Sequence, residues 1–288
     1  MVWPAYVIVK VAEAWQAERM NQGPADAAPA LPASRREVPQ LVWRESAGST
    51  NTELVRLAAD PELPAFTALV TTDQTAGRGR LERSWVAPAG TALAISVLVR
   101  AEASGLGWLP LAAGLAMSTA VSNVLPKARA VGIKWPNDVQ VDGLKICGIL
   151  SEVVPGGSES STVAVVIGAG LNVTMSAEQL PVPTATSLVL AGADGADLFD
   201  RVLSAYLHSL TELVTVLGAN GGDADRSGLR AAVIDRCSTI GREVRVELPD
   251  GARLLGRAIG IDAHGRLEVR DDVALVRAVA AGDIIHLR

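Results

Sequence analysis

The sequence predicts a mixed α/β or α+β domain followed by a small C-terminal β-barrel. Strands and helices are mixed in order over residues 40–237, and short alternating strands separated by turns fill residues 238–288. The chain has 288 residues, of which 49% are apolar and 20% charged, so it carries enough apolar side chain for a large core. Residues 1–39 fit neither pattern.

These first 39 residues are expected to be a flexible N-terminal extension. The stretch from Gly23 to Pro32 is too rich in proline and alanine to pack well. The apolar run at residues 2–9 has no basic residue before it and no clear cleavage pattern, which disfavours a secretory signal.

Strands and helices then follow one another up to residue 125. Thr50 and Glu53 have the spacing of a capping box, which marks the start of a helix that stops at Asp60-Pro61. The predicted elements are strands at 41–44, 67–72 and 91–100, a helix at 50–59, a glycine- and arginine-rich loop at 75–84, and an apolar helix at 106–125.

The apolar helix raises the question of a membrane span, because residues 106–125 contain no charge and are long enough to cross a bilayer. Pro110 near its start and Ser118 and Ser122 toward its end instead favour a helix buried in a protein core. We therefore expect no membrane association.

The second half alternates in the same way and ends in short strands. Asp142-Gly143 between two strand-like runs predicts a hairpin, and a stripe of Leu203, Leu207, Leu210 and Val214 predicts an amphipathic helix. The predicted elements are strands at 130–134, 139–141, 144–152 and 162–173, a helix at 197–217, and barrel strands at 243–248, 253–261, 267–270, 273–279 and 284–287.

Charge and cysteine content limit the possible functions. The net charge of −5 gives no general attraction to nucleic acid, and the two cysteines, Cys147 and Cys237, are too few for a disulfide framework, so a cytoplasmic protein is expected. Of 26 basic residues only four are lysines, which leaves 22 arginines. A lysine in such a background suggests a site that needs a compact ammonium. The four are Lys10, Lys127, Lys134 and Lys145.

Common catalytic and binding motifs are missing. Gly77 and Gly79 begin a possible dinucleotide fingerprint, but its sixth position is Glu82, and there is no phosphate-binding loop of the GxxxxGK type. The spacing of histidines and cysteines predicts no metal site.

Three segments carry unusual polar chemistry. The loop at 74–85 combines glycines with Arg78, Arg80 and Arg83, which suits either an anionic ligand or a solvated surface loop. Residues 134–138, Lys-Trp-Pro-Asn-Asp, mix groups that core packing rarely needs together. In the strand at 144–152, alternation places Lys145 on the face of Cys147 and Ile149, and Gly148 leaves room for a ligand.

Together these segments resemble the biotin–protein ligase family. The matching strings are GSTN at 48–51, GRGR at 77–80 leading to Trp85, KWPND at 134–138 and G-x-K-x-x-G-I-L at 143–150. The resemblance covers residues 41–288. It implies a mixed sheet like that of class II aminoacyl-tRNA synthetases, an SH3-like barrel at the C-terminus, and the bacterial type without an N-terminal DNA-binding domain.

The resemblance also implies an activity and its partners. Biotin would react with ATP, with Mg²⁺ as counter-ion, to give biotinyl-5′-AMP, and a lysine of the biotin carboxyl carrier domain of acyl-CoA or pyruvate carboxylases would then displace AMP. The implied enzyme is cytoplasmic, binds no nucleic acid and is a monomer or weak homodimer.

Site residues follow by position in the matching strings. In the arginine loop Leu81, Glu82 and Ser84 depart from the more basic or glycine-rich family pattern. The implied catalytic residues are Lys145, Arg78 and Asp138. The implied biotin contacts are Ser49, Thr50, Asn51, Gln74, Arg78, Gly79, Arg80, Lys145 and Gly148, and the implied nucleotide contacts are Arg80, Arg83, Asn137, Lys145 and Asn172.

Other functions remain possible at this stage. Lipoate ligases and octanoyl transferases share the implied fold. A regulator that senses biotinyl-adenylate would need an N-terminal DNA-binding domain, for which the Pro/Ala-rich extension is unsuited. A biotin-binding protein without activity would not need the cations on the phosphate side, Lys145 and the arginines.

Overall fold

The computed structural model describes residues 30–80, 83–155, 162–248, 251–280 and 282–287, and Leu31–Arg288 form one compact unit. Its centre is a mixed seven-stranded sheet in the order β1-β2-β5-β9-β8-β7-β6, in which only β1 and β2 run parallel. The predicted mixed sheet is therefore confirmed. The strands are β1 (Leu41–Trp43), β2 (Ala68–Thr71), β5 (Ala92–Glu102), β6 (Val131–Lys134), β7 (Asp138–Val141), β8 (Leu144–Val153) and β9 (Thr162–Asn172).

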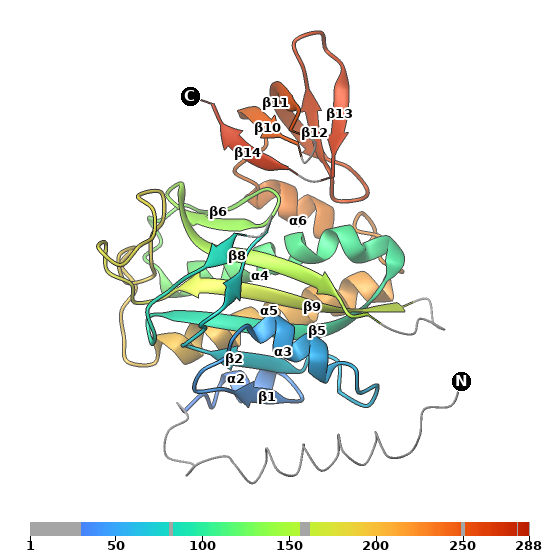
Figure 1. Cartoon of the computed structure of the whole chain (residues 1–288). Helices are drawn as coiled ribbons and strands as arrows, with labels where there is room; N and C mark the ends of the chain where they lie inside the picture. Colours follow the sequence, from blue (N-terminus) through green and yellow to red (C-terminus); the bar gives the residue numbers. More distant parts are fainter. Residues whose placement is uncertain (1–29, 81–82, 156–161, 249–250, 281, 288) are drawn as a thin grey trace. The chain divides into compact units, whose positions relative to one another are not determined.

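Helices lie on both faces of this sheet (Figure 1). Helices α4 (Leu109–Val124) and α5 (Leu198–Ala219) pack on one face and α3 (Thr50–Leu57) on the other. The predicted stripe of α5 is buried, with its four members at most 4% exposed. Apolar side chains of α4, α5 and the sheet form the main core, and a smaller cluster under α3, which includes Leu54, Leu69 and Leu98, lies on the other face.

Among the residues that the structure describes, two stretches have the length and composition of membrane spans, Ala103–Val124 and Leu198–Ala219. Most of the first stretch is buried in the fold, where α4 packs between α5 and the sheet. Burial of this kind is what a core helix of a folded domain shows, and it agrees with the interpretation of residues 106–125 from the sequence.

The N-terminal boundary differs from the prediction. Residues 31–38 belong to the predicted extension, yet Leu31 is 2% exposed and Val38 is 6% exposed. A short helix, α2 (Ser34–Glu37), docks on α5 because the Asp200 carboxylate accepts hydrogen bonds from the backbone N–H of Ala33 and from both the N–H and the hydroxyl of Ser34. The remaining residues of the predicted extension lie outside the described part of the chain.

We predict that Asp200→Asn lowers the free energy of unfolding by about 2 kcal/mol, because a buried acceptor of three hydrogen bonds loses its charge. Although partial burial opposes it, the hydrogen bonds from Ser34 and Ala33 lower the pKa of Asp200. This stabilisation is complete above the pKa of an unfolded aspartate, about 3.9, and is lost as the pH falls through the lower folded value. Urea unfolding should show a constant difference from wild type above pH 5 that shrinks below pH 4. The exposed Asp194→Asn serves as the control, and an equal effect there would contradict the assignment.

The hairpin of β7 and β8 forms as predicted, with positive φ at Asp142 and Gly143 in its turn. Its register corrects the predicted face of Lys145. Gln140 pairs with Lys145 and Val139 with Cys147, so Ile146 is an extra residue in a β-bulge. The bulge reverses the alternation and places Lys145 on the face of Gly148, opposite to Cys147, which is fully buried.

The C-terminal strands also form as predicted, as one antiparallel sheet in the order β13-β12-β11-β10-β14. Trp108 and Trp135 attach it to the central domain, because their indole N–H groups donate to the carbonyls of Ala263 and Gly265. The strands are β10 (Glu243–Glu247), β11 (Arg253–Ile261), β12 (Leu267–Arg270), β13 (Val276–Val279) and β14 (Asp283–His286). The prediction did not include η1 (Ala103–Trp108), α6 (Leu229–Arg236) or the short pair β3 (Gly77–Arg78) and β4 (Ser84–Trp85).

Candidate active site

The floor of the candidate site is a group of glycines on the α3 side of the sheet. Gly148 on β8 lies opposite Gly170 on β9. A Cβ atom on Gly170 would lie 2.6 Å from the indole of Trp85, and one on Gly168 would overlap the amide of Asn51. These strands therefore need glycine so that a tryptophan and an asparagine can lie flat against the sheet.

The N-terminus of α3 forms one wall. Ser49, not Thr50, is the N-cap, and its side chain accepts a hydrogen bond from the N–H of Thr52. Thr50 is thereby in the first turn, where its N–H and hydroxyl both donate to the Oε1 atom of Gln74. The buried hydroxyl of Ser96 lies 2.8 Å from Thr50 Oγ1 and 2.6 Å from Asn51 Oδ1.

The arginine loop covers this floor from one side. Arg78 donates to the carboxylate of Glu152. Arg80 donates to Asn137 Oδ1 and to the carbonyl of Gly282. Arg83 donates to the carboxylate of Asp283 on β14, so the C-terminal sheet also contributes to the site. Leu81 and Glu82, two of the departures from the family pattern, lie outside the described residues.

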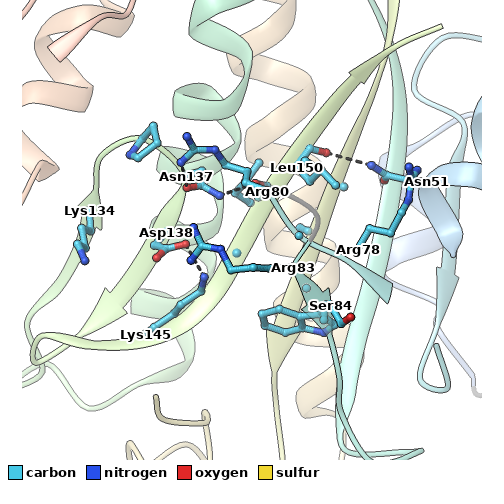
Figure 2. A pocket seen from close by; sticks show the side chains of 18 of the residues that line it. Asn51, Arg78, Arg80, Arg83, Ser84, Lys134, Asn137, Asp138, Lys145 and Leu150 are labelled. Carbon is cyan, nitrogen blue, oxygen red and sulfur yellow. Dashed lines mark hydrogen bonds and ion pairs between the residues drawn. The ribbon is translucent and has the colours of Figure 1, made fainter. Parts of the chain in front are cut away.

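The KWPND turn lies on the other side. Asp138 and Lys145 form an ion pair at 2.6 Å, and Lys145 Nζ lies 6.0 Å from the ring centroid of Trp85. Asn137 donates to the carbonyl of Ile149 and so fixes the turn to β8. Figure 2 shows Asp138, Lys145 and Arg83 converging on one region of the pocket.

These walls enclose a pocket of about 390 Å³, large enough for a small organic ligand. Five cations line it: Arg78, Arg80, Arg83, Lys134 and Lys145. Burial lowers the pKa of Lys134 and of Arg80. Cations gathered in a partly desolvated pocket attract anions strongly, so the pocket can hold two negatively charged groups side by side.

The structure brings together all but one of the site residues that the sequence suggests. The exception is Asn172, which does not line the pocket and whose buried amide donates to the carbonyl of Thr186. The prediction omitted Gly168, Gly170, Ser96 and Glu152. It also omitted Glu247 and Asp283, which enter the pocket from the C-terminal sheet. The Gly168-Ala169-Gly170 pattern was a signal for a strand with one bare face, but nothing local marked the others.

Comparison with known proteins gives the same picture. Residues 43–172 match the model of the biotin/lipoate A/B protein ligase family, and residues 239–287 match that of the biotin protein ligase C-terminal domain. The chain is 39% identical over 255 residues to the biotin–[acetyl-CoA-carboxylase] ligase of Mycobacterium tuberculosis, covering 85% of this chain and 90% of that protein.

The chain belongs to the biotin protein ligase family. The ligase of Aquifex aeolicus solved with biotin and ATP has the same fold, with a TM-score of 0.65 at 24% identity over 87% of this chain and 99% of that one. The ligase of Leishmania major solved with biotinyl-5-AMP gives a TM-score of 0.52 at 26% identity over 84% of this chain and 99% of that one. In this biotin protein ligase family member, the four motifs at 48–51, 77–80, 134–138 and 143–150 all contribute residues to the pocket.

Proposed function

We propose that this protein attaches biotin to a lysine of the biotin carboxyl carrier domain of an acyl-CoA or pyruvate carboxylase, consuming ATP and releasing AMP and pyrophosphate. The observation that carries the proposal is the position of Lys145, whose ammonium enters a cation-lined pocket beside the indole of Trp85. Similarity to the M. tuberculosis ligase over most of both chains supports the same activity.

In the first step a carboxylate oxygen of biotin attacks the α-phosphorus of ATP, the bond to the β-phosphate breaks, and pyrophosphate leaves. Two anions must approach each other, so the main task of the protein is to hold positive charge around both. We assign Lys145 to the space between the carboxylate and the α-phosphate. Such a reaction needs no enzyme nucleophile, and the buried Cys147, whose pKa burial raises, is unsuited to that role.

In the second step the amine of the carrier lysine attacks the acyl carbon of biotinyl-5′-AMP, AMP leaves, and the amine loses a proton. We assign Asp138 to orient this amine, because it is the carboxylate within reach of Lys145 and lines the same pocket.

Two subsites share the pocket. We assign biotin to the end formed by the start of α3, Gln74, Gly79 and Gly148, where Ser49 and Thr50 offer hydrogen bonds to its ring. Asn51 lies beside this end, with its amide N–H groups already donating to Leu150 and Glu152. We assign the nucleotide to the other end, with Arg80, Arg83, Asn137 and Lys145 as its contacts. Asn172 is left out because it does not line the pocket.

Magnesium enters with ATP as its counter-ion. Mg²⁺ bound with a nucleotide usually keeps phosphate oxygens and water as its main ligands. The carboxylates of Glu247 and Asp283 line the pocket as neighbours across β10 and β14 and could supply further oxygen ligands.

We propose a catalytic part that ends near residue 237 and begins at Leu31 rather than 40, followed by the C-terminal sheet at 238–288. The partner is the carrier domain, met in the cytoplasm, and we propose a monomer or weak homodimer that binds no nucleic acid.

The decisive experiment incubates the purified protein with ATP, Mg²⁺ and either biotin or lipoate. We expect ATP–pyrophosphate exchange that depends on biotin, and mass spectrometry should show biotin on the wild-type carrier domain but not on a carrier whose acceptor lysine is replaced by arginine. Equal exchange with lipoate, or transfer of lipoate to its carrier, would favour the lipoate ligase alternative.

A further inference from the structure

Arg78 is paired with a carboxylate, as Lys145 and Arg83 are, but its partner lies at the α3 end of the pocket. Its Nη2 atom lies 2.9 and 2.8 Å from the two carboxylate oxygens of Glu152, a residue of β8 beyond Gly148 and Leu150. Figure 2 shows Arg78 beside Asn51, whereas Lys145 points toward Asp138. Its guanidinium therefore has a protein anion as partner at the α3 end of the pocket.

Glu152 is itself held by Asn51, which lines the pocket at its α3 end. Asn51 Nδ2 donates to the Oε2 atom of Glu152 at 2.8 Å and to the carbonyl of Leu150 at 3.1 Å. Asn51 Oδ1 accepts from the fully buried hydroxyl of Ser96 at 2.6 Å. Gly168 beneath Asn51 has no side chain, which leaves space for this amide. The chain of contacts Ser96, Asn51, Glu152 and Arg78 runs from the sheet to the arginine loop.

The exposure of the side chains increases along this chain of contacts, from Ser96 to Arg78. Ser96 is buried completely and Asn51 is 5% exposed. The side chains of Glu152 and Arg78 are 26% and 48% exposed. The inner members are therefore shielded from water, while the outermost contact is one partly exposed ion pair, which screening by water weakens.

We propose that Glu152 is a positioning residue that holds Arg78, and with it the β3 end of the arginine loop, over the biotin end of the pocket. Arg78 then acts by keeping the loop in place and not by stabilising charge at the α-phosphate, which Lys145 does. This inference rests on the proposed function, because the retained ligands are biotin and its adenylate.

The test uses Glu152→Gln, Arg78→Gln and the double variant in the full-length protein. We expect each to raise the biotin dissociation constant and the dissociation rate of biotinyl-5′-AMP about fivefold, the effect of losing one partly exposed ion pair. The rate of adenylate formation at saturating biotin and ATP should change less than twofold. The double variant should resemble either single variant, because the two residues act through one contact.

Glu53→Gln is the matched control. Glu53 lies on α3, the same helix as Asn51, and forms a partly exposed ion pair with Arg44. This variant should leave biotin affinity and adenylate release unchanged. A large loss of the chemical rate in Arg78→Gln but not in Glu152→Gln, or additive effects in the double variant, would overturn the inference. Calorimetry measures biotin affinity without any reaction, so it tests the role of Glu152 even if the wild type catalyses no exchange. Failure of the proposed function and failure of this inference therefore give different results.

Discussion

Lys145→Ala is expected to reduce biotin-dependent ATP–pyrophosphate exchange by about a thousandfold, the upper range for removing one preorganised charge from a reaction centre. The ammonium of Lys145 is held at 2.6 Å from Asp138, and Gly148 beside it leaves space for a ligand. Without this cation the biotin carboxylate and the α-phosphate would repel each other, and Asp138 would add a further uncompensated negative charge.

The controls separate chemistry from folding. Lys127 is exposed, so Lys127→Ala should keep full exchange activity. Lys145→Arg should recover only a small part of the rate, because the larger, planar guanidinium group cannot take the place of a compact ammonium beside Gly148. Circular dichroism and urea unfolding should show a folded Lys145→Ala protein, since Lys145 is partly exposed. Exchange at the wild-type rate in that variant would remove Lys145 from the mechanism.

The elements of the fold were predictable because their signals are local. Short apolar runs predicted the central strands, and the leucine stripe of α5 predicted a helix that is buried as expected. The errors have a long-range cause. Residues 31–38 directly follow the Pro/Ala-rich stretch and have no local sign of a partner, and what holds them is Asp200, which lies about 170 positions away in the chain.

The same distinction holds for the site. Lys145 was recognisable as an odd residue in an apolar strand, but its face depends on the bulge at Ile146, which only pairing with β7 reveals. Nothing in the sequence indicated that Glu152 pairs with Arg78, 74 positions away, or that Asp283 pairs with Arg83, 200 positions away. Local motifs therefore identified the chemistry, whereas strand register determines which groups meet.

Gly170→Ala is expected to raise the biotin dissociation constant by about a hundredfold while leaving the protein folded, because only one methyl group is added and the steric conflict is with one side chain. The new Cβ atom would lie 2.6 Å from Trp85 Cε2, closer than such contacts occur, so the indole must leave the sheet. Trp85 and Gly79 line the pocket together, so displacing the indole disturbs the wall that the arginine loop completes.

The direction of this effect can be checked with two further variants. Gly218→Ala on α5 has open space around its new methyl group, so it should leave biotin binding unchanged and slightly raise stability. Adding Trp85→Phe to Gly170→Ala substitutes a smaller ring, which should recover part of the lost affinity because the conflict is steric. If calorimetry showed wild-type affinity for Gly170→Ala, the indole would not be a wall of the biotin subsite. If the double variant bound no better than Gly170→Ala alone, the loss would come from the strand itself, and the glycine would be needed for the sheet and not for the tryptophan that lies on it.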